Sequence, residues 1–391
     1  MYKIRTLNNI SEKGLEKFPR KDYEVGSEIS DPDAILVRSH QLSVDDATPS
    51  LRAVGRAGTG VNNIPVSDYT DKGIVVFNTP GANANAVKEL VMAGLLLSCR
   101  GIIQGIEYVD SLQGREDETE LDKLVEDSKK QYKGSELKGK TLGVLGLGAI
   151  GSMVAEMALQ MEMQVQGYDP ALSVEAAWRL SRRVKKMENM QALFSRSDII
   201  SLHVPALDST RVMINEETLA YFKDGAVLLN FARGELVDSD AIARALDGGK
   251  LSQYISDFPV PGLIGRRGVV STPHLGASTS EAEENCAMMV ADQVIDFLEN
   301  GNIRNSVNFP SLVMDRNGSG FRLALANKNV PRILGSVLSI LADRNINVID
   351  MLNKSRDDIA YNIIDIEIRP TGDLVQDILD IEGVINVRVL D

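Results

Sequence analysis

Two side chains in the second half of the chain have the chemistry to act on a small anion. Arg233 follows the apolar run 226–230, and His274 follows the apolar run 268–272. A guanidinium is a planar fork that fits a carboxylate, and an imidazole exchanges protons near neutral pH. Because open α/β sheets bind ligands outside the carboxyl ends of their strands, both residues are predicted to face one cleft. Taken alone, Arg233 could instead be a plain surface arginine, and His274 could be a structural histidine.

A glycine motif at 146–151 predicts a partner for that chemistry. An apolar run precedes the motif, a helical pattern follows it, and a second apolar run ends at Asp169, as in a dinucleotide fingerprint. Gly146 would allow the tight turn, Gly148 the approach of a pyrophosphate, and Gly151 close packing of a helix whose N-terminus attracts phosphate. Asp169 would bind the ribose hydroxyls and repel a 2′-phosphate, so NAD is favoured over NADP. The alternative is a glycine-rich turn without a ligand.

The composition is that of a globular protein with an acidic balance. The 391 residues suffice for two or three domains, and 43% of them are hydrophobic. A net charge of −13 argues against nucleic acid as a partner. No apolar stretch approaches the roughly 20 residues that span a membrane, and the N-terminal residues lack the apolar segment of a secretory signal. Cys99 and Cys286 lie in separate apolar helical patterns, so we expect core thiols, a cytoplasmic protein and no metal site.

The residues around these motifs predict an α/β protein with three parts. Residues 1–98 alternate short apolar runs with helical patterns, and they end in a long apolar helix at 83–100. The charged stretch 115–134 indicates a solvated helix. Strands of the first part are expected at 4–9, 34–39, 51–58 and 73–80.

The chain is then expected to leave the first domain and return to it. Residues 99–279 would form the NAD-binding domain, and a helix at 280–300 would carry the chain back, so the substrate domain would be discontinuous, 1–98 with 280–312. A linker including 314–320 follows. Residues 319–391 show a βαββαβ pattern, which is typical of a sheet with helices on one face. Later strands of the NAD-binding domain are expected at 198–205, 226–234, 254–259 and 268–276.

Seven segments of the chain carry a combined signal, at 37–40, 56–64, 76–90, 143–151, 203–210, 228–238 and 272–279. Together they resemble the D-2-hydroxyacid dehydrogenase family. Within it, the chain is similar to the branch that oxidises 3-phospho-D-glycerate with NAD, the first step of L-serine biosynthesis, and that ends in an ACT domain. The resemblance implies a doubly wound Rossmann-type nucleotide domain, a split flavodoxin-like substrate domain and a C-terminal ACT domain, in a homodimer or homotetramer.

The resemblance also implies roles for individual residues. Arg233 would hold the substrate carboxylate and polarise the C2–O bond, and His274 would be the acid/base. Backbone groups of Gly58, Gly60 and Val61 would hold the carboxylate as well. Arg38 and Arg56 are the main candidates for the substrate phosphate, with Lys88 and His40 weaker; ordinary surface charges are the alternative. NAD would be bound by Thr59, Gly146, Gly148, Ala149, Ile150, Gly151, Asp169, Pro205, Thr210, Ala232, Asp257 and Ala277.

One position departs from the family pattern in the catalytic centre. The family has a glutamate 29 residues after the catalytic arginine, where it holds the imidazole, and this chain has Gly262. Without that carboxylate, His274 loses its orienting partner and a group that stabilises its protonated form. We therefore expect weaker catalysis unless Glu281 or Asp257 substitutes.

A second departure lies in the C-terminal module. Asn329 and Asn347 match the amino-acid-binding positions of an ACT domain, which implies L-serine as an effector; turn asparagines are the alternative. Arg332 stands where the family has a glycine that lets the backbone approach the effector, and its side chain would crowd the pocket.

Two other functions stay open at this point. One is a dehydrogenase for another D-2-hydroxy acid, against which Arg38 and Arg56 favour a phosphorylated substrate. The other is an NAD-sensing binding protein similar to the C-terminal-binding corepressors. Gly262 favours that second interpretation, whereas Arg233, His274 and the ACT-like pattern favour an enzyme.

Overall fold

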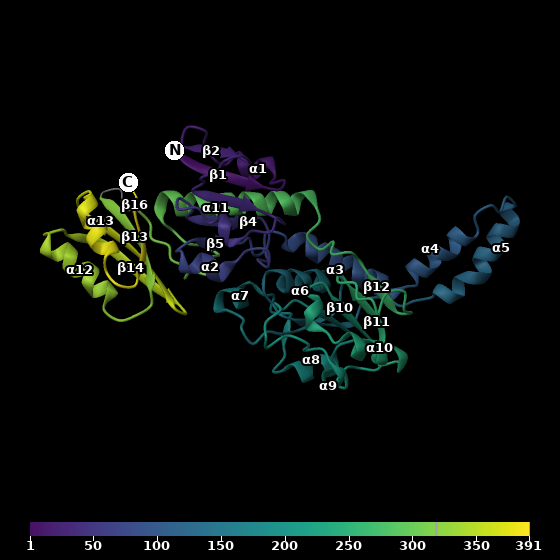
Figure 1. The fold of residues 1–391 in the computed structure, drawn as a ribbon. Coiled ribbons are helices and arrows are strands. Elements are labelled where there is room, and N and C mark those ends of the chain that lie inside the picture. Colours follow the sequence, from purple (N-terminus) through teal and green to yellow (C-terminus); the bar gives the residue numbers. More distant parts are fainter. Residues whose placement is uncertain (317–319, 391) are drawn as a thin grey trace. The chain divides into compact units, whose positions relative to one another are not determined.

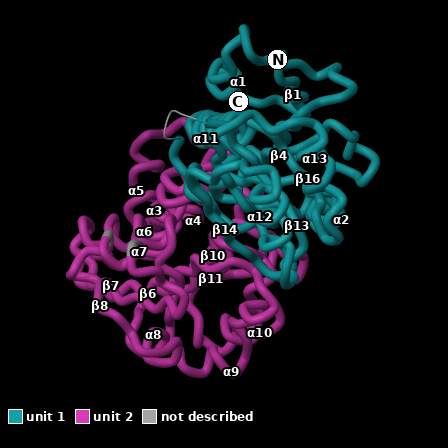
Figure 2. The backbone as a smooth tube through the Cα atoms, turned by 90° about the vertical axis from the view of Figure 1, so that its left-hand side faces the viewer, with its two compact units in different colours: residues 1–83, 280–391 teal, residues 84–279 magenta. Residues whose placement is uncertain are grey.

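The chain folds into two compact units in a computed structural model that describes residues 1–316 and 320–390. One unit contains residues 1–83 and 280–391, and the other contains residues 84–279 (Figures 1 and 2). Residues 317–319 of the expected linker lie outside the described residues, as do residues 319 and 391, the two limits of the expected C-terminal domain.

The first unit contains a five-stranded parallel sheet. Its order is β2-β1-β3-β4-β5, which is the flavodoxin-like order. Every residue of β3 is buried, because a parallel sheet covered on both faces needs continuous apolar strands. β2 was not among the expected strands, because its four residues are too few to show a pattern. The elements are β1 (Tyr2–Leu7), α1 (Glu12–Leu15), β2 (Tyr23–Gly26), β3 (Ala34–Val37), η1 (Val44–Asp46), β4 (Ala53–Arg56), α2 (Val66–Asp71), β5 (Val75–Phe77) and the long helix α11 (Ser280–Asn300).

The second unit is a doubly wound sheet of seven parallel strands. Its order, β12-β11-β10-β9-β6-β7-β8, is the Rossmann order extended by one strand, so the predicted Rossmann-type fold is confirmed. The strands are β6 (Thr141–Leu145), β7 (Gln164–Tyr168), β8 (Lys185–Lys186), β9 (Ile199–Leu202), β10 (Ala226–Asn230), β11 (Leu251–Ser256) and β12 (Val269–Ser271). The helices are α3 (Ala84–Cys99), α4 (Ile102–Ser111), α5 (Glu118–Ser128), η2 (Lys129–Tyr132), α6 (Ala149–Gln160), α7 (Val174–Arg179), α8 (Met190–Arg196), α9 (Glu216–Leu219), η3 (Gly234–Leu236) and α10 (Ser239–Asp247).

Helix α3 packs in the second unit, whereas residues 84–98 were expected in the first domain. Val91 and Leu95 are fully buried in the same apolar cluster as Val154 of α6. Gly94 faces Phe231 so closely that a Cβ would lie 2.9 Å from its ring. The boundary therefore falls before α3, because the apolar face of this helix is buried against the nucleotide-type sheet.

Residues 321–390 of the first unit form a four-stranded antiparallel sheet with two helices. The βαββαβ order matches the sequence pattern, and the strand order is β14-β15-β13-β16. Leu323 and Leu325 lie in one cluster with apolar residues of the two helices. The elements are β13 (Phe321–Lys328), α12 (Ile333–Asp343), β14 (Val348–Arg356), β15 (Ile359–Ile366), α13 (Gly372–Leu379) and β16 (Val384–Leu390).

The other face of this antiparallel sheet is covered as well. Tyr361 and Ile363 of β15 share an apolar cluster with Phe297 of α11 and with Phe309 and Leu312 of the segment that follows it. All eight residues of β15 are buried as a result. The C-terminal module is therefore part of the core of the first unit.

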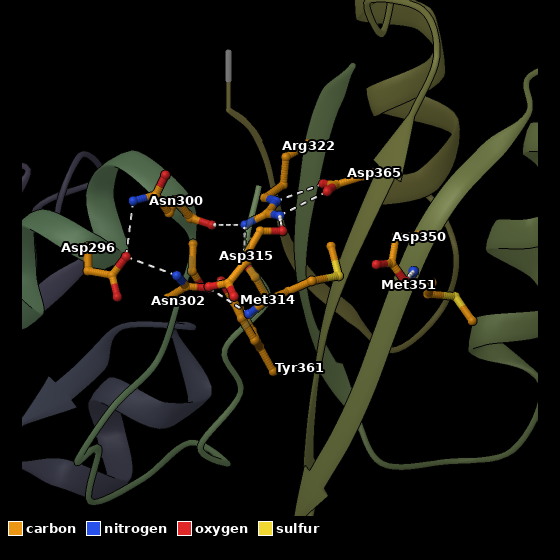
Figure 3. A network of polar contacts seen from close by, with 11 residues as sticks. Asp296, Asn300, Asn302, Met314, Asp315, Arg322, Asp350, Met351, Tyr361 and Asp365 are labelled. Carbon is orange, nitrogen blue, oxygen red and sulfur yellow. Dashed lines mark hydrogen bonds and ion pairs between the residues drawn. The ribbon is translucent and has the colours of Figure 1, made fainter. Parts of the chain in front are cut away.

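Side chains of the C-terminal module also cap the end of α11. Arg388 donates hydrogen bonds to the carbonyl oxygens of Phe297 and Leu298, at 3.2 and 2.8 Å. Arg322 donates to the carbonyl of Asn300 at 3.0 Å, and Tyr361 donates through its hydroxyl to the next residue, Gly301, at 2.8 Å (Figure 3). The last carbonyls of a helix have no partner within the helix, and cations are favourable at that end. The module therefore supplies the C-terminal cap of α11.

Arg322 also forms a buried ion pair with Asp365. Nε and Nη2 of the arginine lie 2.7 and 2.8 Å from the two carboxylate oxygens. The side chains are 1% and 11% exposed. The carbonyls of Met314 and Asp315 accept further hydrogen bonds from the guanidinium (Figure 3). Such complete pairing offsets the cost of burying the charge.

Replacing Asp365 with alanine should lower the free energy of unfolding by about 3–5 kcal/mol, because Arg322 would stay buried without its counter-charge. Asp377→Ala is the matched control, because its partner Arg344 lies in the same module but the Asp377 side chain is 49% exposed. The control should lose at most about 1 kcal/mol. Guanidinium unfolding followed by circular dichroism measures the free energy of unfolding of both variants. Equal losses in the two variants would contradict the role of Asp365 as the counter-charge of a buried arginine.

Candidate active site

The turn after β6 contains Gly146, Gly148 and Gly151, and each of them has different surroundings. Gly146 has φ +89°, and a Cβ there would lie 2.5 Å from the carbonyl oxygen of His203. At Gly151 a Cβ would lie 1.9 Å from the carbonyl oxygen of Gly146. At Gly148, the N-cap of α6, a Cβ would meet no atom within 4 Å, and no side chain caps the helix. The open position beside the helix N-terminus fits a pyrophosphate.

Asp169 ties the end of β7 to this turn. Its carboxylate accepts hydrogen bonds from the backbone N–H of Leu147 at 2.8 Å and of Ala171 at 2.9 Å. The side chain stays half-buried at the carboxyl edge of the sheet. A carboxylate at this place fits a ribose with free hydroxyls.

His203 lies against the glycine turn and was not selected from the sequence. Its Nε2 is 2.8 Å from the hydroxyl oxygen of Ser201. Burial lowers the pKa of His203 to about 3, so its imidazole is neutral at physiological pH. His203 therefore adds no positive charge beside a bound dinucleotide and cannot be the group that titrates near pH 7.

Asn230 positions the loop that carries Arg233. It is the fully buried last residue of β10. Its Nδ2 donates to the carbonyl oxygen of Arg233 at 2.9 Å, and its Oδ1 accepts from the N–H of Ala232 at 3.2 Å. The half-buried Arg233 donates through one Nη to the carbonyl of Ala232 at 2.6 Å. Asn230 was not among the residues expected at the site, although an amide residue that ends an apolar strand is a signal for such a role.

Asp257 holds the loop that presents His274. The carboxylate is 1% exposed and follows β11. It accepts from the Thr272 hydroxyl at 2.6 Å and from the N–H groups of Leu275 and Gly276, both at 2.7 Å. Asp257 is also the residue expected near the cofactor or as a substitute partner of His274. Both of its oxygens accept hydrogen bonds from the loop, and none comes from the imidazole.

The imidazole of His274 lies at the surface of the second unit. The residue has φ +59°, and its backbone N–H donates to the carbonyl of Asp257 at 3.0 Å. The ring packs against Phe258, with ring centroids 5.0 Å apart, and forms no hydrogen bond with any described residue of this unit. Gly262 is exposed, and a Cβ there would meet nothing within 4 Å. The expected alternative Glu281 belongs to the other unit.

Six further expected residues of the second unit lie on its loops, on α3 and on α6. Thr210 donates through its hydroxyl to the carbonyl of Pro205 at 2.6 Å and so closes the loop after β9. Ala277 is half-buried just after the His274 loop. Lys88 lies on α3, where it donates to Asn85 at 2.5 Å. Ala149 and Ile150 form the first turn of α6.

The first unit brings together the two arginines expected to bind phosphate. Arg56 ends β4 beside Val37 of β3, so Arg38 and Arg56 leave neighbouring strands at the same edge. Nε of Arg56 donates to the carbonyl of Arg38 at 3.2 Å, and an Nη of Arg38 lies 2.7 Å from Glu283 of α11. At Gly58 a Cβ would lie 2.4 Å from an Nη of Arg56.

The loop 58–61 follows directly, and β5 ends next to it. The carbonyl of Thr59 accepts from Nδ2 of Asn78 at 2.6 Å, and the carbonyl of Gly58 accepts from the N–H of Thr79 at 3.1 Å. Gly60 and Val61 are half-buried. His40 lies on the exposed loop after β3, where its N–H donates to Asn8. The expected substrate residues thus divide between the units, since Lys88 belongs to the second unit.

The two asparagines expected to bind an effector lie at opposite ends of the antiparallel sheet. Nδ2 of Asn329 donates to the carbonyl of Asp357 in the β14–β15 turn, whereas Asn347 precedes β14 and donates to Glu367 at 2.7 Å. Arg332 has φ +82°, a conformation that favours glycine. One copy of the module therefore does not bring both amides to one place.

Neither a metal centre nor a membrane helix is found in the described ranges. Within residues 1–316 and 320–390, no group of three His, Cys, Asp or Glu side chains could hold a metal ion. Of the helices in the same ranges, none is long and apolar enough to cross a bilayer.

Gly148→Ala should weaken NADH binding roughly tenfold or more, because its methyl group would occupy the space that a pyrophosphate enters. Its thermal unfolding should stay unchanged, since no atom lies within 4 Å of that position. Gly151→Ala is the counterpart that should lower the unfolding temperature, because its Cβ meets the Gly146 carbonyl. NADH fluorescence titration and thermal unfolding separate the two effects, and tight NADH binding by Gly148→Ala would contradict the assigned turn.

Comparisons with known proteins agree with this geometry. Residues 94–276 match the NAD binding domain of D-isomer specific 2-hydroxyacid dehydrogenases. The chain is 34% identical to the D-3-phosphoglycerate dehydrogenase of Haemophilus influenzae, over 88% of this chain and 82% of that protein. It is also 34% identical to that of Methanocaldococcus jannaschii, over 89% of this chain but only 64% of the longer relative. The NAD+-bound 3-phosphoglycerate dehydrogenase of Entamoeba histolytica is 27% identical with a TM-score of 0.62, covering 80% of this chain and 99% of that structure. The chain therefore belongs to the D-isomer specific 2-hydroxyacid dehydrogenase family.

Proposed function

We propose that the protein is an NAD-dependent D-3-phosphoglycerate dehydrogenase. It oxidises 3-phospho-D-glycerate to 3-phosphooxypyruvate, the first step of L-serine biosynthesis. The observation that carries the proposal is the carboxyl edge of the second sheet, where the glycine turn, Arg233 and His274 follow β6, β10 and β12. The identity of 34% to D-3-phosphoglycerate dehydrogenases over most of the chain supports it.

Each side chain has a defined part in this reaction. The glycine turn and Asp169 would hold NAD, which would supply the acceptor for the hydride from C2 of the substrate. Arg233 binds the carboxylate through its planar fork and polarises the C2–O bond. His274 accepts the proton of the C2 hydroxyl, and its place on an exposed loop lets it pass the proton to solvent. Asn230 and Asp257 act by positioning, since their hydrogen bonds fix the two loops.

The first unit carries its own group of proposed substrate-binding residues. Arg38 and Arg56 would bind the phosphate, and the N–H groups of Gly58, Gly60 and Val61 would bind the carboxylate. The common edge of β3 and β4 supports the arginine pair, because Arg56 ends β4 beside Val37 and Arg38 directly follows Val37.

We also propose that the C-terminal module is an ACT domain that binds L-serine. The βαββαβ order supports this, as do Asn329 and Asn347. Because those two residues lie at opposite ends of one sheet, a shared site needs a second copy whose β14 runs antiparallel to the first. Such pairing would bring the end of one β14 beside the start of the other.

The second unit gives further support to a homodimer, which could also be half of a homotetramer. Helices α4 and α5 form a hairpin that projects from the rest of this unit (Figure 1). Ile102, Ile106 and Val109 are 39%, 56% and 57% exposed, and their spacing places them on one face of α4. We assign this stripe to a contact with a second copy. The free buried thiols of Cys99 and Cys286 favour a reducing, cytoplasmic location.

The unmodified protein should oxidise NADH in the presence of 3-phosphooxypyruvate between pH 6 and 9. His274→Asn should lower kcat by about 10²–10⁴, the usual contribution of a general acid. His203→Asn is the matched control and should keep the pH dependence of the rate, because His203 is neutral in this range. Gly262→Glu should fold normally and raise kcat, because the position is open and a carboxylate there would orient the imidazole.

Different outcomes of this assay separate the possible functions. Turnover with 3-phosphooxypyruvate supports the proposal. Turnover with other 2-keto acids alone would point to a different D-2-hydroxy acid. NADH binding without turnover, in both the unmodified protein and Gly262→Glu, would favour a binding protein that senses NAD.

Ile106→Glu should convert the oligomer to a smaller species, because a charge would replace the centre of the apolar stripe on α4. Val174→Glu is the control, since its side chain is 74% exposed on α7, away from the hairpin. Size-exclusion chromatography with light scattering gives the masses. An unchanged mass of the Ile106 variant would show that the stripe is not the contact.

A further inference from the structure

Glu283 forms an ion pair with Arg38, whose guanidinium is proposed above to bind the substrate phosphate. Its Oε1 lies 2.7 Å from an Nη of Arg38, and the two side chains are 43% and 35% exposed. Ion pairs with this much exposure contribute little to folding stability. The effect of Glu283 is therefore expected on what binds to Arg38.

Neighbouring groups make Glu283 the main acidic charge at this cluster. The cations are Arg38 and Arg56, which share the edge of β3 and β4. Cys286 lies one helical turn after Glu283, and burial raises the pKa of its thiol, so the group stays uncharged. Glu284, the next residue, points to Lys13 instead, at 2.6 Å. Glu283 is therefore the carboxylate that contacts Arg38 at this edge.

A phosphate ester brings a larger negative charge to this place. It carries about −1.5 to −2 near pH 7. Arg38 can bind it only if Glu283 moves away or stays beside it as a like charge, and either event weakens binding. A substrate with an uncharged hydroxyl at the same carbon meets no such repulsion.

We infer that Glu283 is a specificity-determining residue that competes with the substrate phosphate for Arg38. The inference rests on the proposed function, since it concerns the affinity of the same site for phosphorylated and unphosphorylated 2-keto acids. The negative charge of Glu283 lowers the preference of the site for phosphorylated over unphosphorylated 2-keto acids. Its ion pair with Arg38 also orients the guanidinium.

Glu283→Gln tests this directly, because the amide keeps an acceptor for Arg38 and removes the charge. The KM for 3-phosphooxypyruvate should fall roughly three- to tenfold, with the change in KM and not in kcat. The KM for hydroxypyruvate, which lacks the phosphate, should change by less than about twofold. Glu283→Asp, which keeps a charge on a shorter side chain, should restore a KM for 3-phosphooxypyruvate near the original.

The matched control is Glu284→Gln. It removes the same charge from the adjacent residue of α11, whose partner is Lys13. Its KM for 3-phosphooxypyruvate should stay within about twofold of the unmodified value. Equal effects of the two variants, or equal effects of Glu283→Gln on both substrates, would overturn the inference.

Binding of inorganic phosphate separates this inference from the proposed function. Titration calorimetry of the whole protein with phosphate should show tighter binding to Glu283→Gln than to the unmodified protein and to Glu284→Gln. If neither 2-keto acid is turned over but phosphate binding still tightens, the proposed function fails and the role of Glu283 stands. If 3-phosphooxypyruvate is turned over but Glu283→Gln changes neither its KM nor the affinity for phosphate, the role of Glu283 fails and the proposed function stands.

Discussion

The capping of α11 by the buried Arg322 and the half-buried Arg388 is the interaction on which the first unit depends. The last carbonyls of this helix must find partners once they are removed from water. Arg388, Arg322 and Tyr361 of the antiparallel sheet supply those partners, and the Arg322–Asp365 pair neutralises the buried charge. The first turn of the same helix carries Glu283, the partner of Arg38. The C-terminal module therefore fixes one end of the element whose other end contacts the proposed phosphate site.

Buried polar side chains have the corresponding role in the second unit. Asn230 and Asp257 sit at the ends of adjacent strands, and their hydrogen bonds hold the loops of Arg233 and His274. A buried carboxylate or amide is costly unless it is fully paired, so these residues make the loop conformations well defined. The side chains of Arg233 and His274 can then stay partly exposed without losing their position.

Much of the fold could be predicted because its signals are local. The glycine turn, the apolar parallel strands and helix 280–300 are each encoded within a few consecutive residues. β2 and β8 escaped prediction because two to four residues cannot establish a periodicity. The assignment of α3 failed for another reason: an apolar helix can pack on either neighbouring sheet, and packing against Phe231 decides the matter.

The sequence by itself determined the residue types at the proposed site and the chemistry they allow. Glycine at 146 and 151 is required by backbone sterics, and Arg233 and His274 follow apolar strands whose ends form one edge. Only the tertiary structure decided what those residues touch. The carboxylate of Asp257 accepts hydrogen bonds from the loop of His274. Asn329 and Asn347 lie at opposite ends of one sheet. Glu283 contacts Arg38 from a helix that is far away in the sequence. Such contacts join residues far apart in the chain, so they depend on how the sheets and helices pack and cannot be read from spacing.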